Sequence, residues 1–369
     1  TSYHYWSWQP PDMFEPSDNM VAGGETASVN LSIQLAQRGH EVWHFQHGLR
    51  PQRYRGVDFF PKELARSIIP ATKADVLIAW EDQEAVSWNH RCDLVVFPMQ
   101  TNTLQMGALD WGVDYYQAVS NWHVETLVRS DGSLPLSVRD RFVVFPNGVN
   151  LERYAQLIER VPGRVIYSSS PDRGLHHLLR IWPEIKKRVP HASLRIFYDK
   201  DKLQQIVAQQ QAEGFILNTS DRAWQVQAGI EATKDLDVVH VGAVGQWRLA
   251  QEQLAASLML YPMDSVDAKT EGFSVSVLEA MAAGTPVLTT DGDAFPELWS
   301  DCTTQIALPI EGKEQLWIDA AVRLLTNERE WKKWSKIGKK KAATLTWDII
   351  GERYEAWLIS ALEEKQKAL

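Results

Sequence analysis

Two carboxylates eight positions apart, Glu271 and Glu279, lie in the segment of the chain with the clearest chemical meaning. Between them, Gly272 and residues 273–276 lead into a pattern typical of a helix, which we expect to begin near Phe273. The first amides of a helix have no intrahelical acceptor and attract a phosphate, and a glycine lets a ligand approach the backbone closely. Ionised carboxylates accept hydrogen bonds from sugar hydroxyls. The segment therefore suits a ligand that carries both phosphate and hydroxyl groups.

The same residues also have a purely structural interpretation. Glu271 could serve only to stabilise the positive end of the helix dipole, and Glu279 could be solvated on the polar face of that helix. Taken singly, neither carboxylate distinguishes a ligand-binding role from this structural one.

Short apolar runs and helical patterns alternate around this segment. Ala27, Leu31 and Leu35 recur every four residues, and Gly39 follows as a helix stop. Apolar runs that end at turn residues are typical of buried parallel strands. They form one series at residues 41–45, 75–80, 93–98, 115–120 and 141–146, and a second at 164–168, 193–198, 238–241, 257–261, 286–290 and 305–308. Two such series predict an α/β protein with two doubly wound, Rossmann-like parallel-sheet domains joined near residues 147–151.

Composition excludes several classes of protein. The 369 residues include 38 basic and 47 acidic side chains, and this acidic balance argues against nucleic acid as a partner. The two cysteines lack metal-ligand spacing, so we expect neither a zinc site nor a disulfide scaffold. No run approaches the roughly 20 apolar residues of a membrane span, and the first residues lack the features of a signal peptide. We expect a cytoplasmic protein with at most peripheral membrane association.

The segment at residues 270–288 resembles the E-x7-E signature of the retaining GT-B glycosyltransferases, specifically glycosyltransferase family 4, the group 1 glycosyltransferases. The resemblance continues along nearly the whole chain in the family's order. It includes the glycine loop at residues 23–27, the segments 120–122 and 146–149, a phosphate loop at 168–174, a strand end at 239–244 and a final helix from Trp347. The implied fold is GT-B, with the two domains facing across a cleft.

The resemblance implies specific roles. Glu271 would contact the hydroxyls of the donor sugar, Glu279 the nucleotide ribose, and Arg173 the diphosphate in place of the family's lysine, so Glu271 and Arg173 are the predicted catalytic residues. The predicted donor-binding residues are Gly23, Gly24, Ser169, Ser170, Arg173, Gly242, Val244, Lys269, Gly272, Phe273, Ser274, Val275, Ser276 and Glu279.

Two departures from the family pattern concern the site. The arginine that usually precedes the phosphate-loop lysine is absent, because residues 168–170 are all serine. Many members also place a histidine after the fourth strand of the first domain, where this chain has Gln100 and Asn102. We expect Gln100, Asn102 and Trp122 on the acceptor side.

Three other patterns have simpler interpretations. Asp291-Gly-Asp293 looks like a metal-binding motif, but its position before Pro296-Glu297 favours a polar turn. His176 and His177 are expected on a helix surface, and Gly242-Ala-Val-Gly245 is too short for a dinucleotide fingerprint. We expect no metal and no cofactor.

The resulting prediction is a glycosyltransferase that moves a sugar from a nucleoside-diphosphate-sugar donor to the hydroxyl of a glycan or other acceptor, with retention of anomeric configuration. The first domain would comprise residues 1–151 with a returning helix at 348–369, and the second residues 152–347. A catalytically silent GT-B sensor or scaffold and a nucleotide-sugar epimerase are the alternatives.

Overall fold

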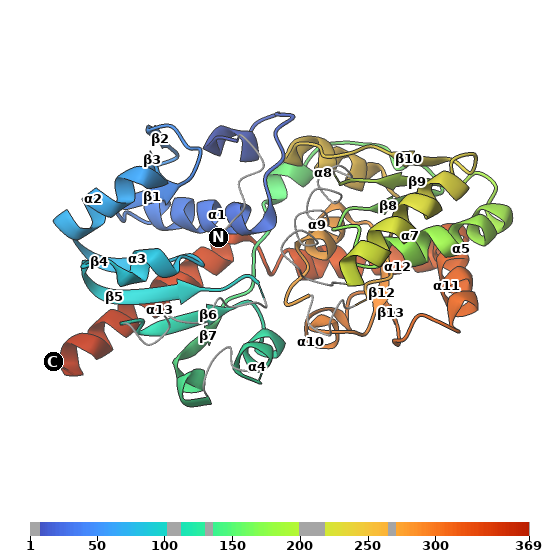
Figure 1. The fold of residues 1–369 in the computed structure, drawn as a ribbon. Coiled ribbons are helices and arrows are strands. Elements are labelled where there is room, and N and C mark those ends of the chain that lie inside the picture. Colours follow the sequence, from blue (N-terminus) through green and yellow to red (C-terminus); the bar gives the residue numbers. More distant parts are fainter. Residues whose placement is uncertain (1–7, 102–111, 130–135, 199–217, 265–270, 369) are drawn as a thin grey trace. The chain divides into compact units, whose positions relative to one another are not determined.

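The computed structural model describes residues 8–101, 112–129, 136–198, 218–264 and 271–368. The chain forms two compact units. The first comprises Thr1–Gly148 with Leu345–Leu369, and the second comprises Val149–Thr344 (Figure 1). The chain therefore leaves the first unit once and returns to it once.

A four-stranded parallel sheet forms the centre of the first unit, as the apolar runs predicted. Its order is β4-β5-β6-β7. The apolar half of β5 is buried, and helices of this unit contact the strand. The strands are β4 (Lys73–Ile78), β5 (Arg91–Pro98), β6 (Tyr115–Ala118) and β7 (Phe142–Val144).

A second, smaller sheet in this unit was only partly predicted. β1 (Val42–Gln46) pairs in parallel with β3 (Val57–Pro61), and β2 (Gln52–Tyr54) adds to β3 in the antiparallel sense. The sequence indicated β1 but neither of the other two strands of this sheet. Among its described residues, the first unit thus holds two separate sheets and one antiparallel pair, where a single parallel sheet was expected.

The returning C-terminal helix completes the core of the first unit. Tyr354, Leu358 and Ala361 of α13 are buried against Leu31 and Leu35 of α1. Gly39 follows α1 with a φ of +98°, which confirms the predicted stop. The helices of this unit are η1 (Pro10–Met13), α1 (Gly23–Gln37), η2 (Lys62–Leu64), α2 (Ala65–Ala71), α3 (Gln83–Ser87), α4 (Asn121–Arg129), η3 (Leu136–Arg141) and α13 (Trp347–Ala368).

The second unit is built on one parallel sheet of six strands in the order β10-β9-β8-β11-β12-β13. Every pairing in it is parallel. Counted along the unit, this is the order 3-2-1-4-5-6 of the doubly wound fold. The strands are β8 (Arg164–Tyr167), β9 (Ser193–Ile196), β10 (Val238–His240), β11 (Leu258–Tyr261), β12 (Val287–Thr290) and β13 (Thr304–Ile306).

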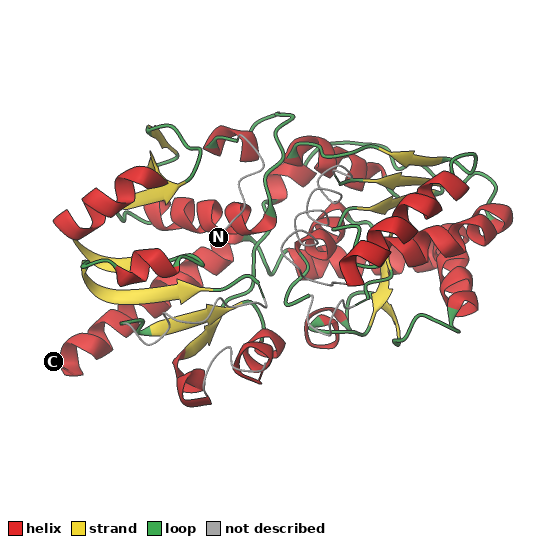
Figure 2. Ribbon diagram, viewed as in Figure 1, coloured by secondary structure: helices red, strands yellow, loops and turns green. Residues whose placement is uncertain are grey.

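Helices cover both faces of this sheet (Figure 2). α5 packs with α7 and α11, and α9 packs with α8 and α12. Trp182 of α5 and Trp317 of α11 are fully buried, so these tryptophans fill the core. The helices are η4 (Leu151–Tyr154), α5 (Leu175–Arg188), α7 (Asn218–Ala232), α8 (Gln246–Ala255), α9 (Val275–Ala283), α10 (Phe295–Trp299), α11 (Glu314–Thr326) and α12 (Glu328–Ala342). Within the described ranges, no helix combines the length and apolar character that a membrane crossing requires.

Candidate functional site

The strand order of the second unit reverses between β8 and β11, which are neighbours in its sheet. Open α/β sheets bind their ligands at such a switch point, outside the carboxyl ends of the strands. The loop at residues 168–174 follows β8, and Glu271 lies between β11 and α9. The structure thus brings Ser169, Ser170, Arg173 and Glu271 together at this edge.

Arg173 and Glu271 form an ion pair at the switch point. The Arg173 Nη1 donates to Glu271 Oε2 at 2.8 Å, and the Tyr261 hydroxyl donates to the same oxygen at 2.8 Å. Ser169 Oγ donates to the Tyr261 hydroxyl at 3.0 Å. The Glu271 side chain is 6% exposed and the Arg173 side chain 33%. Arg173 is therefore the member of the pair that a solvent-borne anion can reach.

The electrostatics of the pair keep a cation at this edge. The Glu271 charge raises the pKa of the Arg173 guanidinium, so Arg173 stays protonated. Burial raises the pKa of the Glu271 carboxyl, while the Arg173 charge and the Tyr261 hydrogen bond oppose that rise. Burial also raises the pKa of Tyr261 well above 10.0, so its hydroxyl keeps the proton that it donates.

Backbone contacts fix the shape of the loop at residues 168–174. The Tyr167 hydroxyl donates to the carbonyls of Ser170 at 2.7 Å and Arg173 at 3.1 Å. Gly174 has a φ of +99°, and a Cβ there would lie 1.8 Å from the Pro262 carbonyl oxygen. Only glycine fits this backbone conformation and this close approach. The loop is therefore held directly against the end of β11.

The start of α9 differs from the prediction. The helix begins at Val275, two residues later than expected, because Ser274 acts as its N-cap and accepts a hydrogen bond from the Val277 amide. Phe273 lies before the helix, buried edge-on against Trp299 at 5.1 Å between ring centroids. The amides at N1 and N2 belong to Val275 and Ser276. Ser276 Oγ donates to the Ser168 carbonyl at 2.7 Å, which places this helix start beside the loop at residues 168–174.

Glu279 is not the solvated residue that the structural interpretation assumed. Its side chain is 12% exposed, and its Oε1 lies 3.6 Å from Nη1 of Arg153, which is 2% exposed. Burial raises the pKa of Glu279, and the Arg153 charge opposes that rise. Sequence reasoning missed Arg153, because only the fold brings η4 to α9.

Gly242 and Val244 follow β10, which lies two strands away from β8. Gly242 has a φ of +88°, and a Cβ at this position would meet nothing within 4 Å. Val244 is 8% exposed. Lys269 lies outside the described residues, as does Asn102 of the first unit.

Four predicted site residues of the first unit lie in the described part of the chain. Gly23 and Gly24 are the first residues of α1, and Trp122 lies half-buried on α4. Gln100 follows β5, and its Oε1 accepts a hydrogen bond from Asn147 Nδ2 at 2.8 Å. Of these positions, Gln100 and Trp122 lie just after strands, in the loop that follows β5 and in the first turn of the helix that follows β6.

Sequence reasoning also missed Glu81, which organises the loop after β5. Its Oε1 accepts hydrogen bonds from the amides of Gln100 at 2.8 Å and Thr101 at 2.7 Å, and from the Thr101 hydroxyl at 2.9 Å. Glu81 itself has a φ of +49°, which is rare for a residue other than glycine. No local pattern in the sequence marks such a contact.

Asp291-Gly-Asp293 forms a turn in which both carboxylates bind backbone amides. Asp291 Oδ1 accepts from the Leu308 amide at 2.9 Å, and Asp293 Oδ2 accepts from the Glu271 amide at 2.9 Å. The interpretation as a polar turn therefore agrees with the structure. Asp293 has a further effect, because it helps to fix the backbone of Glu271.

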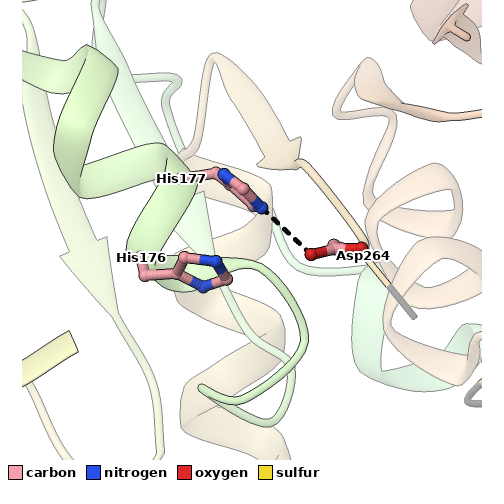
Figure 3. Close-up of side chains that lie close together, drawn as sticks. All are labelled: His176, His177 and Asp264. Atoms are coloured by element: carbon pink, nitrogen blue, oxygen red, sulfur yellow. Dashed lines mark hydrogen bonds and ion pairs between the residues drawn. The ribbon is translucent and has the colours of Figure 1, made fainter. Parts of the chain in front are cut away.

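The prediction that His176 and His177 both lie on a helix surface was wrong for His177. His177 is only 1% exposed, and its Nε2 lies 3.1 Å from Asp264 Oδ2 (Figure 3). His177 occupies the inner face of α5, where periodicity would place an apolar residue. His176 is partly buried beside it, with 3.9 Å between the ring centroids.

Comparison with known sequences assigns the second unit to a family. Residues 162–327 match the family described as glycosyl transferases group 1. A curated relative, an MMP alpha-(1->4)-mannosyltransferase of Mycolicibacterium hassiacum, is 27% identical over 214 residues. That alignment covers 56% of this chain and 45% of the relative. The chain thus spans less than half the length of this relative.

Solved structures share the fold across both units. AviGT4, a glycosyltransferase involved in avilamycin A biosynthesis, has a TM-score of 0.65 at 17% identity, covering 94% of this chain and 91% of that one. A sucrose-phosphate synthase from Thermosynechococcus elongatus has a TM-score of 0.67 at 14% identity, covering 94% and 96%. Anabaena HepE, in complex with UDP and glucose, has a TM-score of 0.65 at 13% identity, covering 94% and 98%.

The fold of the chain is therefore GT-B, with a Rossmann-like sheet in each unit. The recognition of a group 1 glycosyltransferase from the sequence is confirmed, and the family match lies in the second unit.

Proposed function

We propose that this protein transfers a sugar from a nucleoside-diphosphate sugar to an acceptor hydroxyl, with retention at the anomeric carbon. The observation that carries the proposal is the Arg173–Glu271 ion pair at the switch point of the second unit, beside the start of α9. A cation, a helix N-terminus and a carboxylate meet there, and these groups suit a diphosphate attached to a sugar.

Arg173 and the amides of Val275 and Ser276 bind the diphosphate in this proposal. They stabilise the charge that develops on it as the glycosidic bond breaks. Arg173 can turn toward phosphate because a third of its side chain is exposed. Phosphate then replaces part of the interaction that Glu271 provides in the free protein.

Glu271 orients the sugar. Its two hydrogen bonds from Arg173 and Tyr261 both end on Oε2, and among the described residues none donates to Oε1. That oxygen is the acceptor we assign to a sugar hydroxyl. The Tyr261 and Asp293 contacts hold the residue in place, so the sugar meets a preorganised carboxylate.

The other predicted roles complete the proposal. Glu279 accepts from the ribose, Gly242 and Val244 contact the base, and residues of the first unit, including Gln100, Asn102 and Trp122, contribute to the acceptor side. The curated relative is named for mannosyl transfer and HepE was solved with UDP and glucose, which supports a hexosyl donor. We propose no metal, so activity persists in excess EDTA. The cytoplasmic location expected from the sequence stays a prediction.

The test compares wild-type protein with Glu271→Gln. Thermal shift with UDP-, GDP-, ADP- and dTDP-sugars identifies the donor, because a ligand that binds only the folded state raises its stability. Release of nucleoside diphosphate with candidate acceptors is then measured. We expect Glu271→Gln to lower turnover about a hundredfold, because the sugar loses its positioning acceptor. Binding of the nucleoside diphosphate alone is retained, since Arg173 no longer shares its charge with a carboxylate.

Glu252→Gln is the matched control. Glu252 pairs with Arg195 at 2.8 Å and is 14% exposed, and its second partner, Arg164, lies at the opposite end of β8 from the phosphate loop. Equal losses in both variants would contradict a specific role for Glu271. Donor binding without turnover on any acceptor would favour the silent sensor or scaffold, and conversion of the sugar without its release would favour the epimerase.

A further inference from the structure

Arg222 of α7 connects the phosphate loop to the end of β11. Its Nη1 donates to the carbonyls of Asp172 at 3.0 Å and Asp264 at 3.1 Å, and its Nη2 donates to Asp264 Oδ2 at 2.7 Å. Asp172 is the neighbour of Arg173 in the loop. The Arg222 side chain is 14% exposed and that of Asp264 is 26% exposed. One planar guanidinium therefore joins two segments that each lead to a residue of the proposed site.

Asp264 receives a second hydrogen bond from the start of α5. His177 Nε2 lies 3.1 Å from Asp264 Oδ2, the oxygen that also accepts from Arg222 (Figure 3). Burial opposes ionisation of Asp264, but the His177 hydrogen bond and the Arg222 charge together lower its pKa below the usual value. Asp264 is thus an ionised acceptor held from two sides.

The same cluster has the composition of a metal site. His176, His177 and Asp264 offer ligand atoms within 4.8 Å of one another. The hydrogen bonds argue against that use. Arg180 Nη2 lies 3.2 Å from His177 Nδ1. Because a guanidinium only donates, Nδ1 is the acceptor and Nε2 carries the proton given to Asp264.

Neither His177 nitrogen is therefore free for a metal in this arrangement. Arg180 and Arg222 both lie against the cluster and would repel a divalent cation, while the Glu311 carboxylate, 3.7 Å from His177 Nε2, is 61% exposed to solvent. The cluster is built to hold Asp264 and, through Arg222, the phosphate loop.

We propose that Arg222, Asp264 and His177 are positioning residues that fix the backbone of the phosphate loop, and thereby Arg173, for the diphosphate of the donor. The proposal rests on the proposed function for the identity of the ligand. It assigns a part in donor binding to α7, a helix on which the sequence predicted no site residue.

The binding test uses Arg222→Gln in the full chain. Calorimetry first measures the affinity of the wild-type protein for UDP and uridine, GDP and guanosine, and ADP and adenosine. The affinities of the diphosphate and nucleoside that bind are then measured for the variant. We expect diphosphate binding to weaken about tenfold while nucleoside binding changes little, because only the phosphate contacts depend on the loop. Arg188→Gln is the control. Arg188 is the last residue of α5, the helix that carries His177, and the substitution removes its ion pair with Asp319 of α11. We expect it to leave both affinities unchanged.

A second measurement does not depend on the nucleotide. Amide hydrogen exchange in residues 168–174 becomes faster in Arg222→Gln and Asp264→Asn without ligand, and keeps the wild-type rate in Arg188→Gln. His177→Leu shows the same faster exchange, whereas His177→Gln, whose amide can donate to Asp264, restores slow exchange. Rescue by the amide separates a hydrogen-bonding role from simple core packing.

Three outcomes overturn the proposal. Unchanged exchange and unchanged diphosphate affinity in the correctly folded Arg222→Gln would show that the loop keeps its position without Arg222. A rise in Tm with added Zn²⁺ that His176→Ala abolishes would assign the cluster to a metal. Wild-type protein that binds no nucleoside diphosphate would contradict the proposed function and the ligand named here, while the exchange data would still report on the loop.

Discussion

The tautomer of the buried His123 side chain, in the first unit, follows from its two hydrogen-bond partners. Its Nδ1 accepts from the Val119 amide at 3.3 Å, so its Nε2 carries the proton and faces the Thr101 carbonyl at 3.2 Å. The side chain is fully buried, and burial lowers its pKa to about 4. Protonation would place a second hydrogen against the Val119 amide, so the folded state holds this imidazole neutral.

This residue predicts a loss of stability in weak acid. The unfolded chain protonates His123 below about pH 6.5, whereas the folded state does so only near pH 4, so stability is lost as pH falls through this interval. We expect a loss of about 2–3 kcal/mol at pH 4.5 from this one group. Urea unfolding of wild type and His123→Gln at pH 7.0, 5.5 and 4.5 measures it. The difference between the two proteins isolates His123 from Glu25, Glu271 and Glu279, whose raised pKa values act in the opposite direction. Parallel pH curves for the two proteins would refute the assignment.

At the residue scale, sequence reasoning found the ion pair of the proposed site but not the residues that hold the site in place. Arg173 and Glu271 follow from motifs and do meet in the structure. Tyr261, Arg153 and Arg222 were missed, because no local pattern in the sequence marks the contacts that they make. A phenol at the end of a strand has many possible partners, and only the fold selects one.

The start of α5 is the element whose geometry most constrains the loop before it. Gly174 is its N-cap, in a left-handed conformation and pressed against the Pro262 carbonyl. Gly242 has a similar φ but open space around it. Substituting each glycine by alanine therefore separates the free-energy cost of a left-handed backbone from the cost of a steric clash.

We expect Gly242→Ala to lower the free energy of unfolding by about 1–2 kcal/mol, the cost of a left-handed alanine. Gly174→Ala should cost at least about 3 kcal/mol, because an added Cβ also meets a backbone oxygen that cannot move freely. Urea unfolding of both variants measures the difference. Equal losses would mean that the segment at Pro262 yields easily and does not hold the loop.

Elements with a clear apolar period were predictable, and those set by side-chain capping or by short polar strands were not. The strands of the second unit appear where the apolar runs placed them. α9 begins two residues late because the Ser274 cap outweighs the apolar character of Phe273, whose ring is needed against Trp299. β2 and β3 were missed because strands of three and five residues with polar members show no distinct alternation.

At the scale of the whole molecule, the last 25 residues belong to the first unit, although they follow the second in the chain. Besides its buried apolar face, α13 makes two polar contacts with the first part of this unit. Asp348 Oδ1 lies 2.8 Å from Arg38 Nη2, and Glu355 Oε1 lies 2.8 Å from His40 Nε2. The first unit is therefore incomplete without this helix.

This arrangement predicts different behaviour for two fragments. We expect residues 149–344 to fold alone, because their described strands form one sheet with helices on both faces. On the proposed function, this fragment also binds the nucleoside diphosphate. Residues 1–148 should not unfold cooperatively unless residues 345–369 are supplied in trans or fused to them. Thermal unfolding followed by circular dichroism tests both fragments. Cooperative unfolding of residues 1–148 alone would contradict the structural role of α13.

The close contact between Gly148 and Trp347 has a consequence for engineering. A Cβ at Gly148 would lie 2.7 Å from the Trp347 ring, so the outgoing and returning segments of the chain touch where they belong to the first unit. Seen from there, the second unit is a cassette whose two ends are adjacent. On the proposed function, a homologous second unit with another donor preference could be exchanged at these two points, and the chimera would test whether donor and acceptor specificity are separable.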